Sequence, residues 1–107
     1  MTTGDAPAEA PQAGEAQPAI TRVFEIVNEK GLHARASAKF VQLVEKFDAK
    51  VVVSRASESA GGDSIMGLMM LAAGIGTSIS VSATGREAAQ VIDALDALVS
   101  SRFGEEE

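Results

Sequence analysis

The sequence predicts an α+β fold in which helices cover one face of an antiparallel sheet, and three observations indicate it. The elements expected along the chain follow the order β-α-β-β-α-β-α, which suits such an arrangement. A chain of 107 residues is the length of one domain with one core. The chain is 46% hydrophobic but has no Trp, no Tyr and only four Phe, so a small aliphatic core is expected.

The two ends of the chain differ in composition from its body. Residues 1–20 hold all three prolines and no basic residue, which predicts a disordered leader. Residues 21–104 form the predicted domain, and residues 105–107 form an acidic tail. The formal net charge of −6 comes from these ends, because the body carries nine acids and nine bases. A neutral body argues against nucleic-acid binding, which needs clustered basic residues.

The first half of the domain predicts a strand, a helix and a hairpin. Residues 21–27 are rich in strand formers and place Phe24 and Ile26 on one face, and a turn follows at Gly31. From Ala34, apolar residues recur with the period of a helix of about three and a half turns. These residues are Ala36, Phe40, Leu43, Val44 and Phe47, with Val41 beside them. Residues 50–54 and 56–60 then predict two paired strands.

The second half of the domain predicts a brief helix and then a strand. The apolar segment DSIMGLMMLAAG is capped by Asp63 or Ser64 and interrupted by Gly67. Residues 78–83 alternate serine with apolar residues, as in a strand with one solvated and one buried face.

A long C-terminal helix follows that strand. Thr84 and Glu87 have the spacing of a capping box, in which each side chain bonds the other residue's amide. The helix is expected to end near Phe103, because Gly104 can leave the right-handed conformation. Its predicted buried face consists of Ala88, Val91, Ile92, Leu95, Leu98 and Val99.

His33 is the only histidine, and it stands in the segment GLHAR at the predicted start of the first long helix. The free amides and the positive end of the helix dipole favour an anion there. A phosphoryl group on the imidazole would meet the amides of Ala34 and Arg35, and the Arg35 guanidinium could hold its oxygens. Neutral imidazole is a nucleophile and its phosphorylated form is a good donor, which indicates a phosphate relay. By local pattern alone, a surface cap without chemistry is the commoner role of such a histidine.

The segments GLHARASAKF and GGDSIMGLMML, with the spacing between His33 and Ser64, resemble HPr, the family of histidine-containing phosphocarriers of the bacterial phosphotransferase system. The resemblance covers residues 21–104 without a gap. It implies an open-faced sandwich with sheet order 1-4-2-3 and three helices on one face. It also implies that enzyme I, charged from phosphoenolpyruvate, phosphorylates His33 on Nδ1 and that Arg35 steadies the phosphoryl group. An EIIA-type protein would accept the group, so the chain would be a carrier rather than a stand-alone enzyme, with no cofactor and no metal.

The surroundings of Ser64 resemble the nitrogen-type, NPr-like branch of that family, whose output is regulatory rather than sugar uptake. Ser64 matches the serine that a dedicated HPr kinase/phosphorylase modifies in some members, and the alternative is a helix cap with no other role. Ala36 stands where many members carry proline, which makes the helix entry less rigid without removing a phosphate ligand.

The candidates for an apolar docking surface are Ile65, Met66, Met69 and Met70. Ile65, Met66 and Met69 are expected on the surface beside His33, where they would dock partner proteins. Methionine is flexible and polarizable, which suits a face that must fit several partners in turn. The alternative is that half of these side chains fill the core, as Leu68 and Leu71 are expected to do.

Two other classes of function remain open. One is a regulatory interaction module of the same fold that carries no phosphate. The presence of both His33 and Arg35 argues against this class. The other is a small-molecule-binding domain, for which the chain has no glycine-rich phosphate loop of sufficient length. The chain also has no cysteine, no signal peptide and no apolar run of the ~20 residues that span a bilayer, so a cytoplasmic location is expected.

Overall fold

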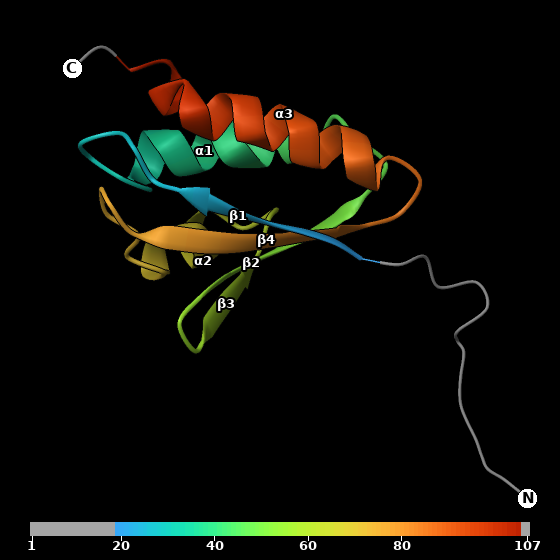
Figure 1. Ribbon diagram of the computed structural model, residues 1–107, viewed down its shortest axis with the longest axis horizontal. Coiled ribbons are helices and arrows are strands. Elements are labelled where there is room, and N and C mark those ends of the chain that lie inside the picture. The colour runs from blue at the N-terminus through green and yellow to red at the C-terminus, as the bar shows by residue number, and fades with distance from the viewer. Residues whose placement is uncertain (1–18, 106–107) are drawn as a thin grey trace, which may run out of the picture.

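The computed structural model describes residues 19–105. Most of the predicted leader (residues 1–18) and the last two residues of the predicted tail (106–107) lie outside the described residues. The elements of the described part, labelled in Figure 1, follow the predicted order. They are β1 (Ile20–Glu25), α1 (Ala34–Val44), β2 (Lys50–Arg55), β3 (Glu58–Gly61), α2 (Ile65–Met70), β4 (Ser78–Thr84), α3 (Ala88–Ser100) and a short 3-10 turn, η2 (Arg102–Gly104).

The four strands form one antiparallel sheet in the order β1-β4-β2-β3. Strand β4 is central, with Ile79 opposite Phe24 of β1 and Val81 opposite Val53 of β2. Helices α1 and α3 run side by side along the sheet in Figure 1, and α2 packs against α1 and β3. The predicted fold class, with its sheet order, is confirmed.

The core lies between the sheet and the helices and is aliphatic, as predicted. The apolar residues of β4 are fully buried, whereas its serines face the uncovered side of the sheet. Burying one such aliphatic side chain contributes about 1.5–3 kcal/mol, so the alternation fixes which face of the sheet the helices cover. The largest fully buried apolar side chains are Phe40, Phe103, Ile26, Leu68, Ile79, Ile92 and Leu95.

Several element boundaries differ from those predicted. Helix α1 ends at Val44, and Phe47 is only partly buried in the turn that follows it. Strand β1 starts one residue earlier than expected because Ile20 pairs with Ala83. Strand β3 starts at Glu58, since Ala56 has the positive φ (55°) of the tight turn that joins it to β2.

The predicted capping box at the start of the last helix is wrong. Thr84 is still part of β4, Gly85 then turns the chain with a φ of +116°, and α3 begins only at Ala88. Glu87 occupies the N-cap position but makes no capping bond with its side chain. Its carboxylate instead accepts a hydrogen bond from the amide of Asp48 at 2.6 Å, which ties α3 to the loop after α1.

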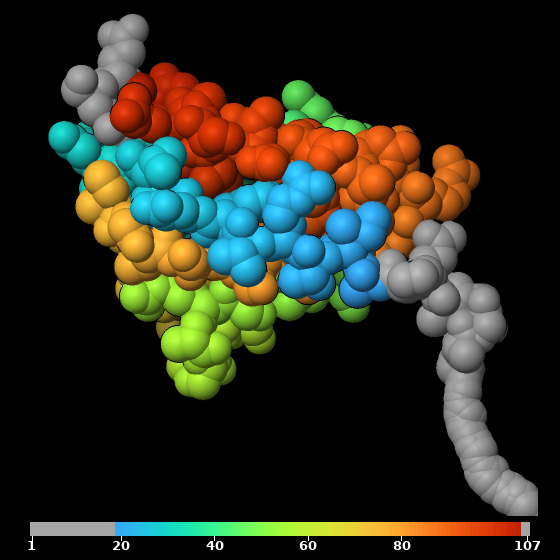
Figure 2. Space-filling view, viewed as in Figure 1, coloured from blue at the N-terminus to red at the C-terminus, as the bar shows by residue number. Residues whose placement is uncertain are grey.

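The C-terminal helix also ends earlier than predicted. Helix α3 stops at Ser100, and the next residues turn back with positive φ at Arg102 (60°), Phe103 (55°) and Gly104 (73°). Phe103 is buried in the core, and its carbonyl accepts a hydrogen bond from Lys39 of α1 at 2.6 Å. Figure 2 shows the result: the red C-terminal turn lies against the cyan segment that leads into α1.

No helix within residues 19–105 is long and apolar enough to cross a membrane.

Candidate functional site

His33 is the N-cap residue of α1, as predicted, with an extended backbone (φ −75°, ψ −178°). Its carbonyl accepts the first helical hydrogen bond, from the amide of Ser37 at 2.8 Å. The preceding Gly31 has a φ of +64°, and a Cβ there would lie 2.3 Å from the carbonyl oxygen of Ala73. The same Ala73 oxygen accepts the Leu32 amide at 3.0 Å. The loop that carries His33 is therefore fixed to the segment after α2.

The two ring nitrogens of His33 have different partners. Nδ1 accepts a hydrogen bond from the backbone amide of Arg35 at 3.2 Å. Nε2 contacts the carboxylate of Glu105, which reaches it from the C-terminal turn. An amide can only donate and a carboxylate accepts, so this pair favours the tautomer with a lone pair on Nδ1 and the proton on Nε2.

Glu105 is itself held by a buried asparagine. The side-chain amide of Asn28 donates to Glu105 at 3.1 Å and to the carbonyl of Gly31 at 3.0 Å. Asn28 is fully buried, and its side-chain oxygen has no hydrogen-bond partner within residues 19–105. Because Asn28 has two fixed acceptors, it positions the Glu105 carboxylate on the His33 ring.

The charge of Glu105 is favoured by its neighbours. Desolvation opposes that charge, but the hydrogen bonds from His33 and Asn28, with the electrostatic attraction of His33 and Lys30, hold the pKa of the Glu105 carboxyl below its usual range. The carboxylate is therefore ionised when it faces the imidazole.

A cleft opens beside His33, and two basic residues, Lys30 and Arg35, stand near it in the sequence. The guanidinium of Arg35 makes no hydrogen bond or ion pair within the described residues. Lys30 and His33 line the shallow cleft together with residues 72–74. An anion that entered this cleft would meet Lys30 and lie at His33, the N-cap of α1.

Ser64 is the N-cap of α2, where its hydroxyl accepts the amide of Gly67 at 3.0 Å. Gly67 lies inside α2 and does not interrupt it, contrary to expectation. A Cβ there would lie 2.9 Å from that of Ala60, so the glycine allows α2 to pack closely on β3. Six residues of helix span about 9 Å. Ser64 is thus at one end of α2, and the segment that touches the His33 loop leaves from the other.

The predicted docking residues are on the surface. Ile65 is 40% exposed, Met66 70% and Met69 39%, whereas Leu68 and Leu71 are buried as expected. Met70, a candidate that was not assigned to the docking face, is the most exposed of the four, at 77%. We define the α2 apolar face as Ile65, Met66, Met69 and Met70.

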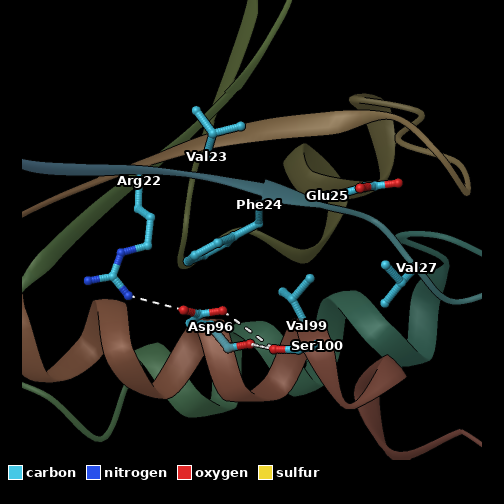
Figure 3. Close-up of a pocket in the computed structure, with 8 residues that line it drawn as sticks. All are labelled: Arg22, Val23, Phe24, Glu25, Val27, Asp96, Val99 and Ser100. Atoms are coloured by element: carbon cyan, nitrogen blue, oxygen red, sulfur yellow. Dashed lines mark hydrogen bonds and ion pairs between the residues drawn. The ribbon is translucent and has the colours of Figure 1, made fainter.

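A separate hollow of about 270 Å³ lies between β1 and α3 (Figure 3). Arg22 lines this hollow and pairs with Asp93 and Asp96 of α3, each at 3.1 Å. Figure 3 shows Phe24 pointing toward α3 and Val23 pointing to the opposite face of the sheet. No predicted site residue lines this hollow. No group of three or more potential metal-binding side chains occurs within residues 19–105.

Sequence reasoning missed Asn28 and Glu105. They lie 77 residues apart, and Glu105 was interpreted only as the start of an acidic tail. No local pattern indicates that Phe103 takes a left-handed conformation, which is what turns Glu105 back toward His33. The only available signal was the buried aromatic residue directly before Gly104 and Glu105.

Comparisons with known proteins agree on one family. The family model described as "PTS HPr component phosphorylation site" matches residues 20–101. The chain is 49% identical over 88 residues to a Phosphocarrier protein HPr of Cupriavidus necator, covering 82% of this chain and 99% of that protein. It is 37% identical over 86 residues to a Phosphocarrier protein NPr of Shewanella violacea, covering 80% and 94%. A crystal structure of HPr from Thermoanaerobacter tengcongensis is similar, with 39% identity, a TM-score of 0.78, and coverage of 82% and 99%.

Proposed function

This chain belongs to the HPr family of phosphotransferase-system phosphocarriers, and we propose that His33 is the residue that carries the phosphoryl group. Enzyme I would be the donor, charged from phosphoenolpyruvate, and an EIIA-type protein the acceptor. The observation that carries this proposal is that the two ring nitrogens of His33 have different partners: the Arg35 amide donates to Nδ1, and the Glu105 carboxylate contacts Nε2.

Nδ1 is the nucleophile in this proposal. The Arg35 amide donates to Nδ1, so the lone pair of that nitrogen points toward the free amides at the start of α1. Nδ1 attacks the phosphorus atom, a nitrogen–phosphorus bond forms, and the bond to the donor's leaving atom breaks. The Arg35 amide is then released from Nδ1 and, with the Ala34 amide, can donate to phosphoryl oxygens.

Arg35 and Glu105 would stabilise different charges during the transfer. The guanidinium of Arg35 is free of protein partners in the described residues and can form paired hydrogen bonds to the phosphoryl oxygens. Phosphorylation of Nδ1 while Nε2 keeps its proton leaves positive charge on the ring. The carboxylate of Glu105 on Nε2 would stabilise that charge and hold the ring in place.

The α2 apolar face would dock the partner proteins. It is exposed, and it adjoins the cleft of His33 through residues 71–74. Such a small interface is typical of short-lived encounters, as a carrier that meets donor and acceptor in turn requires.

Two finer assignments belong to the same proposal. We place the chain in the nitrogen-type branch, with a regulatory output, on the sequence around Ser64 and the similarity to a protein named NPr. We also propose that Ser64 is a regulatory phosphorylation site for an HPr kinase/phosphorylase. Ser64 is partly exposed, and a phosphate there would add up to two negative charges beside the α2 apolar face.

The proposed function is tested by incubation of the chain with enzyme I and phosphoenolpyruvate. One acid-labile phosphate per chain, located on His33 by mass spectrometry, is expected. Ser64→Ala serves as a control that keeps the nucleophile. A chain that binds enzyme I but takes up no phosphate would be a regulatory interaction module instead.

A further inference from the structure

The chain contains few side chains that react with mild oxidants. It has no cysteine, no tryptophan and no tyrosine. Its four methionines are Met1, which lies outside the described residues, and Met66, Met69 and Met70. The three described methionines therefore stand within five consecutive residues, all of them on the proposed docking face.

Two of these methionines are open to solvent in the folded protein. Met66 and Met70 are 70% and 77% exposed and lie four residues apart, so they are neighbours on one side of α2. Leu68 and Leu71 are buried and hold the helix on the core. An oxidant can therefore reach the two sulfur atoms without unfolding α2.

The end of α2 that carries Met70 also lies close to the proposed phosphorylation site along the chain. Met70 is the last residue of α2, and Ala72, two residues later, lines the cleft that contains His33. A partner whose reacting atom reaches His33 must therefore approach the side of the molecule that carries the end of α2.

We propose that Met66 and Met70 are a modification site for peroxides and that their oxidation blocks docking. This inference rests on the proposed carrier function. In the reaction the thioether sulfur attacks one peroxide oxygen, the oxygen–oxygen bond breaks, and a sulfur–oxygen bond forms. Hydrogen peroxide thus gives one methionine sulfoxide and one water, with sulfur oxidised by two electrons and peroxide reduced by two.

Oxidation would change the face from apolar to polar. A sulfoxide oxygen is a strong acceptor, and its burial against an apolar partner surface leaves it without a hydrogen bond. Two such groups in one small interface should lower the efficiency of phosphoryl transfer from the donor by about tenfold or more. The fold should be unaffected, because neither side chain is part of the core. The change is reversible, since sulfoxide reductases return methionine sulfoxide to methionine at the expense of two thiols.

The experiment treats the full chain with dilute hydrogen peroxide and follows oxygen addition in the tryptic peptide of residues 56–86. We expect Met66 and Met70 to be oxidised before Met69, the transfer efficiency to fall with them, and the melting temperature to stay within about 2 °C. A chain oxidised at both residues that transfers at the untreated rate would overturn the proposal. So would a large drop in melting temperature, which would indicate damage to the core.

Matched variants locate the effect. The ratio of treated to untreated transfer efficiency is compared for Met66→Leu/Met70→Leu and for Met69→Leu. We expect the double variant to resist peroxide and Met69→Leu to remain sensitive. Equal sensitivity of both would exclude Met66 and Met70 as the site. In the wild type, a methionine sulfoxide reductase with dithiothreitol should restore transfer, whereas loss through oxidation of His33 would persist and count against the proposal.

The failure of this inference differs from a failure of the carrier function. If the untreated chain accepts no phosphate from enzyme I, the proposed function is wrong. If the untreated chain accepts phosphate and the doubly oxidised chain does so equally well, only the inference is wrong.

Discussion

The start of α1 and the exposed face of α2 are neighbours, but they are held in different ways. At the start of α1 every polar group of His33 has a directional partner: the Arg35 amide, the Glu105 carboxylate and, through it, Asn28. The α2 apolar face has flexible side chains that project into solvent from a helix of six residues.

This difference suggests a division of roles. Group transfer needs one atom in one orientation, and hydrogen bonds provide that. Docking to several partners needs a surface that adapts, and methionines provide that. Substitutions at the start of α1 should therefore act on the rate of transfer, whereas changes on α2 should act on association. The following predictions test that separation.

The largest effect is expected from His33→Ala, which removes the proposed nucleophile and should abolish phosphate uptake from enzyme I. The cost in stability should be about 1 kcal/mol for the lost capping bond, with a further loss from the contact between Nε2 and Glu105. Thermal unfolding and phosphate incorporation measure the two effects. His33→Asn is the matched control, since asparagine restores the cap but not the nucleophile. Phosphate uptake by either variant would assign the chemistry to another residue.

Arg35→Ala should slow transfer by about 100-fold, because it removes paired donors to the phosphoryl oxygens in the transition state. The effect should appear in the single-turnover rate at saturating enzyme I. Arg35→Lys keeps the charge without the planar pair of donors, so an intermediate rate is expected. If Arg35→Ala lowered only the affinity for enzyme I, Arg35 would belong to the docking surface. The proposed division of roles between the start of α1 and the α2 apolar face would then be wrong for this residue.

Glu105→Gln should slow transfer by about tenfold, because a neutral amide supports a positive imidazole less well than a carboxylate does. Nitrogen NMR of the His33 ring should record a larger share of the tautomer with the proton on Nδ1. Glu45→Gln removes the same charge from an exposed position at the other end of α1 and is the control. Unchanged ring signals in Glu105→Gln would remove Glu105 from the mechanism.

The same pair predicts a dependence on pH. The pKa of Glu105 is lowered in the folded protein, so its stabilising contact is fully present above the usual glutamate value of about 4.3 and is lost as the pH falls through the lower folded value. A titration of the His33 ring signals should therefore contain a step below about pH 4.3 in the wild type. Glu105→Gln should lack that step, and a step that persists would have another origin.

The smallest chemical effect is expected at Ser64. Ser64→Asp should raise the KM for enzyme I by several-fold with little change in the maximal rate, because the charge must be desolvated beside the α2 apolar face. Aspartate is a good N-cap, so the melting temperature should hold, whereas Ser64→Ala should lose about 1 kcal/mol. Equal KM values in the two variants would show that Ser64 lies outside the docking surface.

Much of the fold was predictable because its elements are marked by local patterns. The alternation in residues 78–83 specified the central strand and its buried face. The helical spacing of Phe40, Val41 and Val44 specified the buried side of α1. The two-residue period of a strand and the 3.6-residue period of a helix can be seen in each segment alone. In the folded protein, the apolar residues at these periods form the core.

The capping-box error occurs where distant segments compete for the same polar group. Thr84 and Glu87 have capping-box spacing, but the Glu87 carboxylate accepts its hydrogen bond from the Asp48 amide instead. A capping box depends on local geometry, and a partner 39 residues away is outside any local pattern.

By itself, the sequence determined the order of the elements, the face that each one buries, and the place of His33 at the start of a helix. Periodicity and capping chemistry are local, so they can be derived from neighbouring residues. Only the tertiary structure decided which carboxylate meets the imidazole. Burial of Phe103 drives the chain into a left-handed turn, and that turn brings Glu105 to Asn28 and His33. The burial of Phe103 against the assembled core offsets the conformational cost of this turn, and that core exists only once the distant segments have folded together.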